Sequence, residues 1–554
     1  SHGTHVAGII AAEWNNEGTS GVASNAKIMS VRSEVDAASD MLRCINYVTE
    51  AAKAGVNVRV ANCSWGMGSN ASRAFDVAFT QMGQAGVMAV FASGNSDSDM
   101  DATLNTISTL RDNPYVVVTD SIDASGELSM FSCYGQATTD VVAPGSTILS
   151  TWPTSDPQYL GEEDDAAALY ESFDSKTRVA DDILDEGGPV AGGNAVLSFQ
   201  YESMGGQSVP VVQDEKRFDG DASLKLSYSA EEALSLGAGG LMVVRSSELD
   251  LSDLPEKPRY LSIRMTSECA NGGSGSPQVM VSVNTTDGSQ SAPLSVVSEF
   301  GIGGDSWTGY FVELPENTDF ENFGITISYL NLQISVLGGQ RPAQVADGTI
   351  YIDSIGLGSD LVPYKYSQGT SMAAPAVTGA AAVIAGMHSE DSAAQLAAYV
   401  KGAAAGDAYE ESCSTGGYAT VDGAANPSLV PVEAEVAEDG ATVTVRGYFV
   451  PDDVRVSIGG TSCAVVSRDS TVGGSGDSEL TELTVQAPEG FAGGEQWVEL
   501  AGSNGNGRML VQFETIEQED PTEPQATYYD EMNLPVPDEL DDWGGWQLIG
   551  FAGD

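Results

Sequence analysis

Short, almost entirely apolar segments that alternate with helical patterns constrain the fold of this chain most strongly. Such segments are residues 58–62 (VRVAN), 86–92 (GVMAVFA) and 115–119 (YVVVT). Helical patterns accompany them at residues 4–13, 37–53 and 72–86. Strands that are apolar on both faces are typical of a parallel sheet covered by helices on both sides. The first part of the chain therefore predicts an α/β domain.

The pattern changes from about residue 160 to residue 358. Polar and apolar residues alternate there, as in residues 224–228 (LKLSY) and 279–283 (VMVSV), with Asp-Gly turn signals at 219–220 and 287–288. This texture predicts an antiparallel β-sandwich. An alanine-rich helix is expected next, from Ser371 to Met387. We therefore predict a β-sandwich inserted into an α/β domain, followed by another β-rich segment.

Composition restricts the partners of the chain. The 554 residues carry a formal net charge of −56, which disfavours a nucleic-acid partner because phosphate binding needs a basic face. No uninterrupted apolar run reaches the length of about 18 residues expected for a membrane span. The six cysteines show no C-x-x-C spacing, which excludes a zinc ribbon, and they are either buried thiols or partners in a few bridges.

Three short motifs carry the candidate chemistry. They are SHGTHVAG at residues 1–8, ASGN at 92–95 and GTSMAAP at 369–375. Each alone has an ordinary structural explanation, such as helix packing, a turn or a helix cap. Together they resemble the motifs of the subtilisin-like serine peptidases, in the family order. Residues 62–66, 131–135, 140–145 and 417–422 also resemble family segments, and the resemblance covers residues 1–151 and 361–427.

The resemblance implies a Ser/His/Asp mechanism of peptide-bond hydrolysis. Ser371 would be the nucleophile, which needs a base to take its proton, and His2 would be that base. Asn95 would donate its amide to the oxyanion of the tetrahedral intermediate. Catalysis of this kind requires no cofactor. The expected function is that of an extracellular serine endopeptidase acting on protein or peptide substrates.

Further residues are expected around the substrate. Ser64, Trp65 and Gly66 would pair their backbone with an extended peptide, and Ser93 and Gly94 would also bind substrate. His5 lies one helical turn after His2, but no Glu stands between them as a zincin would need, so we expect it to pack behind the site.

The family also has a catalytic aspartate on a strand upstream of the His motif. This chain begins one residue before His2, so that strand is absent and the fragment itself is expected to be nearly inactive. Asp140 and Asp422 belong to other family segments and are not substitutes for it.

A structural calcium ion is a further expectation from the resemblance. Residues 13–21 have the length and glycine positions of the family's calcium loop. The expected ligands are Asn15, Glu13, Glu17 and Thr19. The alternative is an ordinary loop between a helix and a strand.

The predicted fold class is α/β, a subtilisin-like parallel-sheet domain split by an inserted jelly roll and followed by an immunoglobulin-like sandwich of the IPT/TIG kind. The expected boundaries are 1–151 and 361–427 for the peptidase domain, 152–360 for the insertion, 428–515 for the second sandwich, and 516–554 for an acidic linker and the start of a truncated module.

The insertion is expected either to act as a spacer or gate beside the cleft or to bind a cell-surface glycan. Glycan binding would need exposed aromatic side chains, with Trp307, Tyr310 and Phe311 as candidates. The expected location is secreted or cell-surface. The alternative function is a surface adhesin or glycan-binding protein whose peptidase domain is a dead scaffold.

Overall fold

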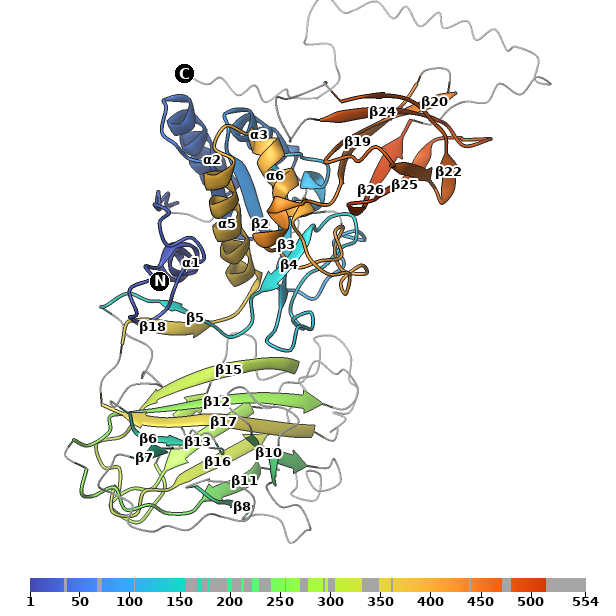
Figure 1. Cartoon of the computed structure of the whole chain (residues 1–554). Helices are drawn as coiled ribbons and strands as arrows, with labels where there is room; N and C mark the ends of the chain where they lie inside the picture. The colour runs from blue at the N-terminus through green and yellow to red at the C-terminus, as the bar shows by residue number, and fades with distance from the viewer. Residues whose placement is uncertain are drawn as a thin grey trace, which may run out of the picture.

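The computed structural model describes residues 1–33, 37–66, 72–103 and 105–155, many strands and connections between 167 and 359, and residues 362–437, 440–470 and 480–514. An α/β layer lies between two β-sandwiches (Figure 1). The expected acidic linker and truncated module at 516–554 lie outside the described residues.

A four-stranded parallel sheet in the order β1-β2-β3-β4 forms the centre of the α/β part. The strands are β1 (Val60–Cys63), β2 (Met88–Ala92), β3 (Val116–Ile122) and β4 (Val141–Pro144). The helices are α1 (His2–Ala11), α2 (Ala38–Lys53), α3 (Arg73–Gln84), α5 (Thr370–Met387) and α6 (Ala393–Gly402), with the short 3-10 helices η1 (Ser108–Leu110) and η2 (Asp422–Ala425).

The apolar run of β2 is explained by helices on both faces of the sheet. Met88, Val90 and Ala92 pack in the cluster that contains α5 and α6. Ala89 and Phe91 pack in the cluster that contains α2 and α3. The α/β prediction is therefore correct, whereas α1 begins at His2 rather than Thr4 and ends before Glu13.

The inserted segment forms two antiparallel sheets that share one hydrophobic core. One sheet has the order β15-β12-β17-β10-β9, with β6 paired to β17 and to β7, and the other has the order β14-β13-β16-β11-β8. The strands are β6 (Ala167–Glu171), β7 (Arg178–Val179), β8 (Phe199–Tyr201), β9 (Val211–Gln213), β10 (Ser223–Tyr228), β11 (Leu241–Ser246), β12 (Tyr260–Cys269), β13 (Gln278–Val283), β14 (Leu294–Val296), β15 (Gly304–Glu313), β16 (Ile325–Leu330) and β17 (Gly348–Gly358).

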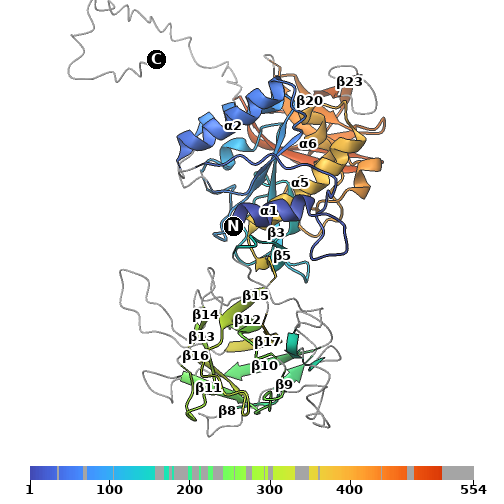
Figure 2. The same cartoon turned by 90° about the vertical axis from the view of Figure 1, so that its left-hand side faces the viewer.

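A separate two-stranded ladder joins the insertion to the α/β part. It pairs β5 (Ile148–Thr151) with β18 (Tyr364–Ser367) in antiparallel register. In Figures 1 and 2 this ladder lies between α1 and the inserted sheets. The chain therefore leaves for the insertion and returns from it through neighbouring strands.

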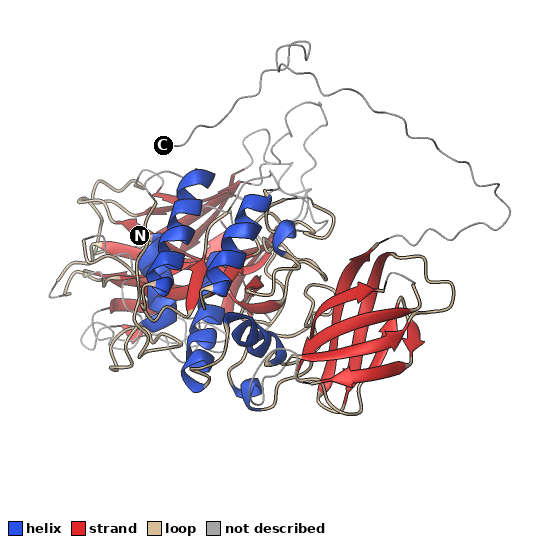
Figure 3. Ribbon diagram, turned by 90° about the horizontal axis from the view of Figure 1, so that it is seen from above, coloured by secondary structure: helices blue, strands red, loops and turns tan. Residues whose placement is uncertain are grey.

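The second sandwich consists of two four-stranded antiparallel sheets around one core, with the orders β19-β20-β24-β23 and β22-β21-β25-β26. Its strands are β19 (Val430–Val436), β20 (Thr442–Tyr448), β21 (Arg455–Ile458), β22 (Thr461–Cys463), β23 (Val465–Asp469), β24 (Thr481–Gln486), β25 (Gly494–Gly502) and β26 (Gly505–Phe513). Figure 3 shows it beside the helices of the α/β part.

The fold explains the apolar helix α5 and shows the state of the cysteines. Among the described residues, α5 is the one helix with the length and hydropathy of a membrane span, but 67% of its apolar window is buried inside the protein, as in a core helix. The five cysteines whose side chains are described, Cys44, Cys63, Cys133, Cys413 and Cys463, are free thiols.

Candidate active site

Ser371 is the second residue of α5 and is half-buried. The preceding Gly369 has φ 141° and ψ 158°, a conformation that is essentially restricted to glycine. Its N–H donates to the Gly145 carbonyl at 2.9 Å, and a Cβ atom on Gly145 would lie 2.8 Å from the Gly369 carbonyl oxygen. Two glycines thus let the end of the 140–145 segment approach the residue before α5.

Pro375 lies inside α5, at its sixth residue rather than in its first turn. A proline there removes the backbone donor that would pair with the carbonyl four residues earlier, which is that of Ser371. The Ser64 hydroxyl donates to this carbonyl at 2.8 Å, and Ser371 Oγ in turn lies 3.5 Å from the Ser64 carbonyl oxygen. The proline therefore leaves the Ser371 carbonyl available to accept from Ser64, and this bond ties α5 to the end of β1.

This tie is supported by a second bond between the same two elements. Asn62 donates its amide to Ser64 Oγ at 2.9 Å and accepts from the Thr378 hydroxyl at 2.9 Å. Two contacts thus link α5 to the end of β1, one at Ser371 and one at Thr378, which lies about two helical turns further along.

Asn95 lies beside the start of α5. Its Oδ1 accepts from the Thr370 backbone N–H at 2.8 Å and from the Thr370 hydroxyl at 2.9 Å. Because a backbone N–H can only donate, this contact fixes which carboxamide atom is the oxygen. The Thr370 hydroxyl also accepts from the Gly94 N–H at 3.1 Å. The carboxamide is therefore anchored to Thr370 through its oxygen and not through its Nδ2 donor.

His2 is exposed in the first turn of α1. Helix α1 packs against α5 through Val6, Ile9, Ile10 and Met372, and Met372 directly follows Ser371. This packing brings the helix that carries His2 to the helix that carries Ser371.

His5 is fully buried behind this pair of helices. Its Nε2 lies 3.0 Å from the Ile148 carbonyl oxygen and 2.8 Å from that of Lys365, so Nε2 carries the proton. Burial lowers the pKa of His5 from 6.5 to about 4, although the two carbonyls act in the opposite direction. His5 is thus a neutral packing residue that joins α1 to the β5–β18 ladder, as the sequence suggested.

The expected substrate-binding residues do not all present their side chains to solvent. The Trp65 ring packs against Phe75 and Phe91 at centroid distances of 5.9 and 4.9 Å, so only its backbone is suited to pairing with a peptide. Ser93 is buried and donates to the Cys133 carbonyl at 3.0 Å. Gly66 is exposed and Gly94 is half-buried.

Asp140 and Asp422 lie where a structural role is expected. The Asp140 carboxylate pairs with Lys401 at 2.8 Å and accepts from the Val118 N–H at 2.8 Å. Asp422 is the first residue of η2.

The loop of the expected calcium site shows a mixed fit. Asn15 Oδ1 accepts from the Glu17 N–H at 3.0 Å, while Glu13 and Glu17 are exposed. The buried Thr19 hydroxyl oxygen has no hydrogen-bond partner in the structure. Within the part of the chain that the structure describes, no group of three or more His, Cys, Asp or Glu residues is placed to hold a metal ion.

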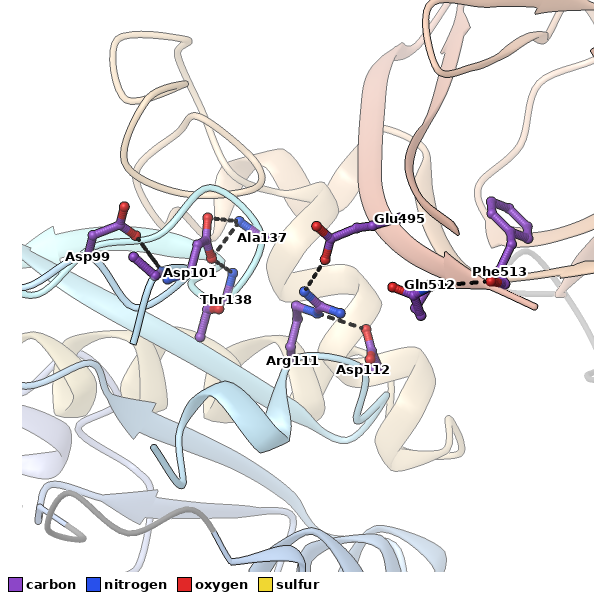
Figure 4. Close-up of polar contacts among 10 residues, drawn as sticks. Asp99, Asp101, Arg111, Asp112, Ala137, Thr138, Glu495, Gln512 and Phe513 are labelled. Atoms are coloured by element: carbon purple, nitrogen blue, oxygen red, sulfur yellow. Dashed lines mark hydrogen bonds and ion pairs between the residues drawn. The ribbon is translucent and has the colours of Figure 1, made fainter. Parts of the chain in front are cut away.

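The segment that follows Asn95 is fixed by an aspartate. Asp101 accepts from the N–H groups of Ala137 and Thr138 at 2.9 to 3.2 Å, and Asp99 accepts from the Asp101 N–H at 2.9 Å (Figure 4). Figure 4 also shows Arg111, which lies 3.6 Å from Glu495 of the second sandwich.

A buried carboxyl group of β3 contacts the residue that follows Thr138. Asp120 in β3 is fully buried, and one of its oxygens accepts from the Thr139 hydroxyl at 2.8 Å while the other has no hydrogen-bond partner. Burial is the main cause that raises the pKa of Asp120 well above its ordinary value. This polar residue lies inside a strand that the sequence predicted only from its apolar part.

Trp307, one of the candidate sugar-binding aromatics, is 5% exposed. Its side chain is therefore not an exposed stacking platform, which removes Trp307 from the three candidates. The side chains of Tyr310 and Phe311 lie outside the described residues.

Taken together, these contacts place Ser371 at the start of a buried helix, next to an asparagine anchored by Thr370, in a parallel α/β domain. The sequence model of the subtilase family matches residues 1–176 and 282–426, which is more than half of the chain. The chain therefore belongs to the subtilase family.

The similar proteins include several with known names. A cuticle-degrading serine protease of Arthrobotrys oligospora is 32% identical over 161 residues, which cover 28% of this chain and 36% of that protein. Subtilisin DY of Bacillus licheniformis is 32% identical over 155 residues (28% and 54%), and thermitase of Thermoactinomyces vulgaris is 36% identical over 157 residues (28% and 52%). The chain thus spans between a third and about half of the length of these relatives.

Among solved structures, a psychrophilic subtilisin-like protease, Apa1, from the Antarctic psychrotroph Pseudoalteromonas sp. AS-11 is similar. It is 19% identical with a TM-score of 0.36, and the match covers 77% of this chain and 83% of that chain.

Proposed function

We propose that this chain is the catalytic part of a secreted serine endopeptidase. Ser371 is the nucleophile, His2 the general base and Asn95 the oxyanion donor. The observation that carries this proposal is the anchoring of the Asn95 carboxamide by Thr370, the residue directly before Ser371. The anchor engages the oxygen and so leaves the donor nitrogen for charge that develops on a substrate carbonyl.

The chemistry follows from these roles. Ser371 Oγ attacks the carbonyl carbon of the peptide bond while His2 accepts the hydroxyl proton, and Asn95 Nδ2 donates to the resulting oxyanion. His2 then returns the proton to the leaving amine, which breaks the C–N bond and leaves an acyl group on Ser371. Water, deprotonated by His2, releases the acyl group.

Substrate is expected to bind as an extended strand beside residues 64–66. Ser64 connects this segment to the nucleophile helix, so a peptide paired with its backbone would lie next to Ser371. Such main-chain pairing suits flexible or unfolded segments of proteins.

The carboxylate that orients His2 is expected upstream of the His motif, where the family has it. Asp140 does not fit this role because its carboxylate is paired with Lys401 and with the Val118 N–H.

A fluorophosphonate probe tests the proposal on the full-length protein. Labelling is expected for the wild type and not for Ser371→Ala, with slow labelling for His2→Ala. Ser389→Ala serves as the matched control because this exposed serine lies outside the site. Labelling that persists in Ser371→Ala would contradict the assignment, and an unlabelled wild type would favour an adhesin built on a dead scaffold.

Three finer features belong to the same proposal. The inserted sandwich is assigned as a jelly roll and the second sandwich as an immunoglobulin-like module, both acting outside the cell.

Calcium is assigned to the loop at residues 13–19, with the unpaired Thr19 hydroxyl oxygen as its support. Chelation with EGTA should lower the melting temperature of the wild type more than that of Asn15→Ala, and an equal change in both would contradict the assignment.

A further inference from the structure

The β5–β18 ladder supports both helices that carry the candidate catalytic residues. His5 of α1 contacts the carbonyls of Ile148 and Lys365, one on each strand of the ladder. The Ser150 hydroxyl donates to the His5 carbonyl at 2.8 Å, and the Thr151 hydroxyl donates to the Thr4 carbonyl at 2.9 Å. The helix that begins at His2 is therefore bonded to the ladder through both its backbone and a buried side chain.

The other strand of the ladder leads directly to the nucleophile. β18 ends at Ser367, and Ser371 follows four residues later. Gly369, between them, is held by its bond to the Gly145 carbonyl and adopts a conformation that few residues tolerate. A displacement of β18 along or away from β5 would therefore be transmitted to the start of α5.

The inserted domain also contacts this ladder. The Arg264 guanidinium of β12 lies 4.1 Å from the centroid of the Tyr366 ring in β18. Arg264 is only 3% exposed, so this cation–ring contact is largely desolvated, the condition in which such contacts are strongest. A second contact joins the Thr147 hydroxyl, just before β5, to the carbonyl of the buried Trp307.

The sheet of the insertion is built to present Arg264 toward the peptidase part. Ile263 and Met265 face the core of the insertion, so by alternation Arg264 lies on the opposite face of β12. That face is buried too, since Thr266 and Arg264 are both shielded from solvent.

A local irregularity accompanies this arrangement. The register between β12 and β17 shifts between Ser262 and Arg264, and Ser354 of β17 has a φ of +53°. The shift places the fully buried Asp353 opposite Arg264. Bulges of this kind re-aim side chains, and here the arginine has an acidic cross-strand neighbour and an aromatic ring of the other domain.

We propose that Arg264 of the insertion is a positioning residue for the peptidase reaction, acting through Tyr366 and β18 on the placement of Ser371. The insertion then stabilises the positions of the two helices that carry His2 and Ser371, in addition to any role beside the cleft. The proposal rests on the proposed function, because its kinetic consequence requires that Ser371 is the nucleophile.

The kinetic test compares Arg264→Ala with wild type in the full-length protein, using a fluorophosphonate probe and a peptide substrate. Small displacements of reacting groups have large kinetic effects, so we expect kcat and the labelling rate to fall about tenfold or more while KM changes by less than about threefold. Arg264→Lys, which keeps a cation over the ring, should recover most of the rate. Lys225→Ala is the matched control, because Lys225 lies 5.7 Å from the Tyr351 ring within the same sheet of the insertion.

A second measurement keeps the proposal independent of activity. Amide hydrogen exchange across residues 364–371 should accelerate in Arg264→Ala and remain at the wild-type rate in Lys225→Ala. An unlabelled wild type would refute the proposed function, while the exchange experiment would still test whether Arg264 stabilises β18 and the start of α5. Unchanged kcat and exchange in folded Arg264→Ala, or equal losses in Arg264→Ala and Lys225→Ala, would overturn the inference.

Discussion

The replacement of Thr370 by valine tests the anchoring of Asn95 most directly. The Thr370 hydroxyl donates to Asn95 Oδ1 and accepts from the Gly94 N–H, and the residue is 1% exposed. Valine keeps the shape of threonine but loses the first bond and leaves the Gly94 donor without this acceptor. A lost hydrogen bond together with a stranded donor costs roughly 2–3 kcal/mol of stability.

The effect on turnover should be smaller than that of removing the donor itself. Loss of an oxyanion donor costs about 10²–10³ in kcat, a range established on subtilisin itself, whose family this chain shares. In Thr370→Val the Thr370 backbone N–H still holds Asn95 at 2.8 Å, so one of two anchors remains. We therefore expect kcat to fall about 10- to 30-fold, which corresponds to about 1.4–2 kcal/mol.

A double-mutant cycle measured as kcat and KM of the full-length enzyme decides whether Thr370 acts through Asn95. Once Asn95→Ala has removed the carboxamide, Thr370→Val should cause little further loss of kcat. Thr370→Ser retains the hydroxyl and should stay close to wild type. Additive losses in the double variant, or an unchanged kcat in folded Thr370→Val, would refute the reasoning.

Three further predictions concern buried titratable groups. The pKa of His5 is about 4 in the folded protein, against an ordinary value of 6.5. Its contribution to the free energy of unfolding is therefore constant above pH 6.5 and falls by about 3 kcal/mol as the pH decreases to 4. Denaturant titrations of His5→Gln should lack this dependence on pH. The pKa of Asp120 is raised by burial, so stability is lost as pH rises from the ordinary value of 3.8 through the folded value, and Asp120→Asn should stabilise the protein more at pH 7 than at pH 4 in the same assay. An equal effect at both pH values would contradict this sign. Burial raises the pKa of Cys63 and of Cys413 to about 12, so iodoacetamide should modify the half-buried Cys44 of the native protein before these two thiols, as followed by mass spectrometry. Modification of Cys63 or Cys413 before Cys44 would be inconsistent with the structure.

Much of the α/β part could be predicted from local pattern. The apolar run at residues 86–92 indicated a doubly covered strand because both of its faces pack against helices. The limits were less accurate, since α1 begins two residues before the expected start and β3 continues to Ile122 through polar residues. Asp120 was missed because its partner Thr139 becomes a neighbour only when β3 and β4 pair.

Pro375 shows a different limit of sequence reasoning. A proline in the first turn of a helix is harmless, because its missing N–H has no partner within the helix there. Pro375 is instead the sixth residue of α5, where its missing N–H would have donated to the Ser371 carbonyl, and Ser64 supplies the replacement donor from 307 residues away. The consequence of one residue thus depended on a partner that no local pattern identifies.

The sequence by itself determined the family and the candidate chemistry, because Ser371, His2 and Asn95 stand in short motifs whose residue types and order are specific. The tertiary structure decided which contacts hold these residues in place. Thr370 donates to Asn95, His5 donates to the Lys365 carbonyl, Ser64 donates to the Ser371 carbonyl, and Arg264 lies over the Tyr366 ring. The first three of these contacts are hydrogen bonds between residues more than 270 positions apart. Hydrophobic periodicity reports which face of an element is buried, and it carries no information on which distant donor or ring will meet that face.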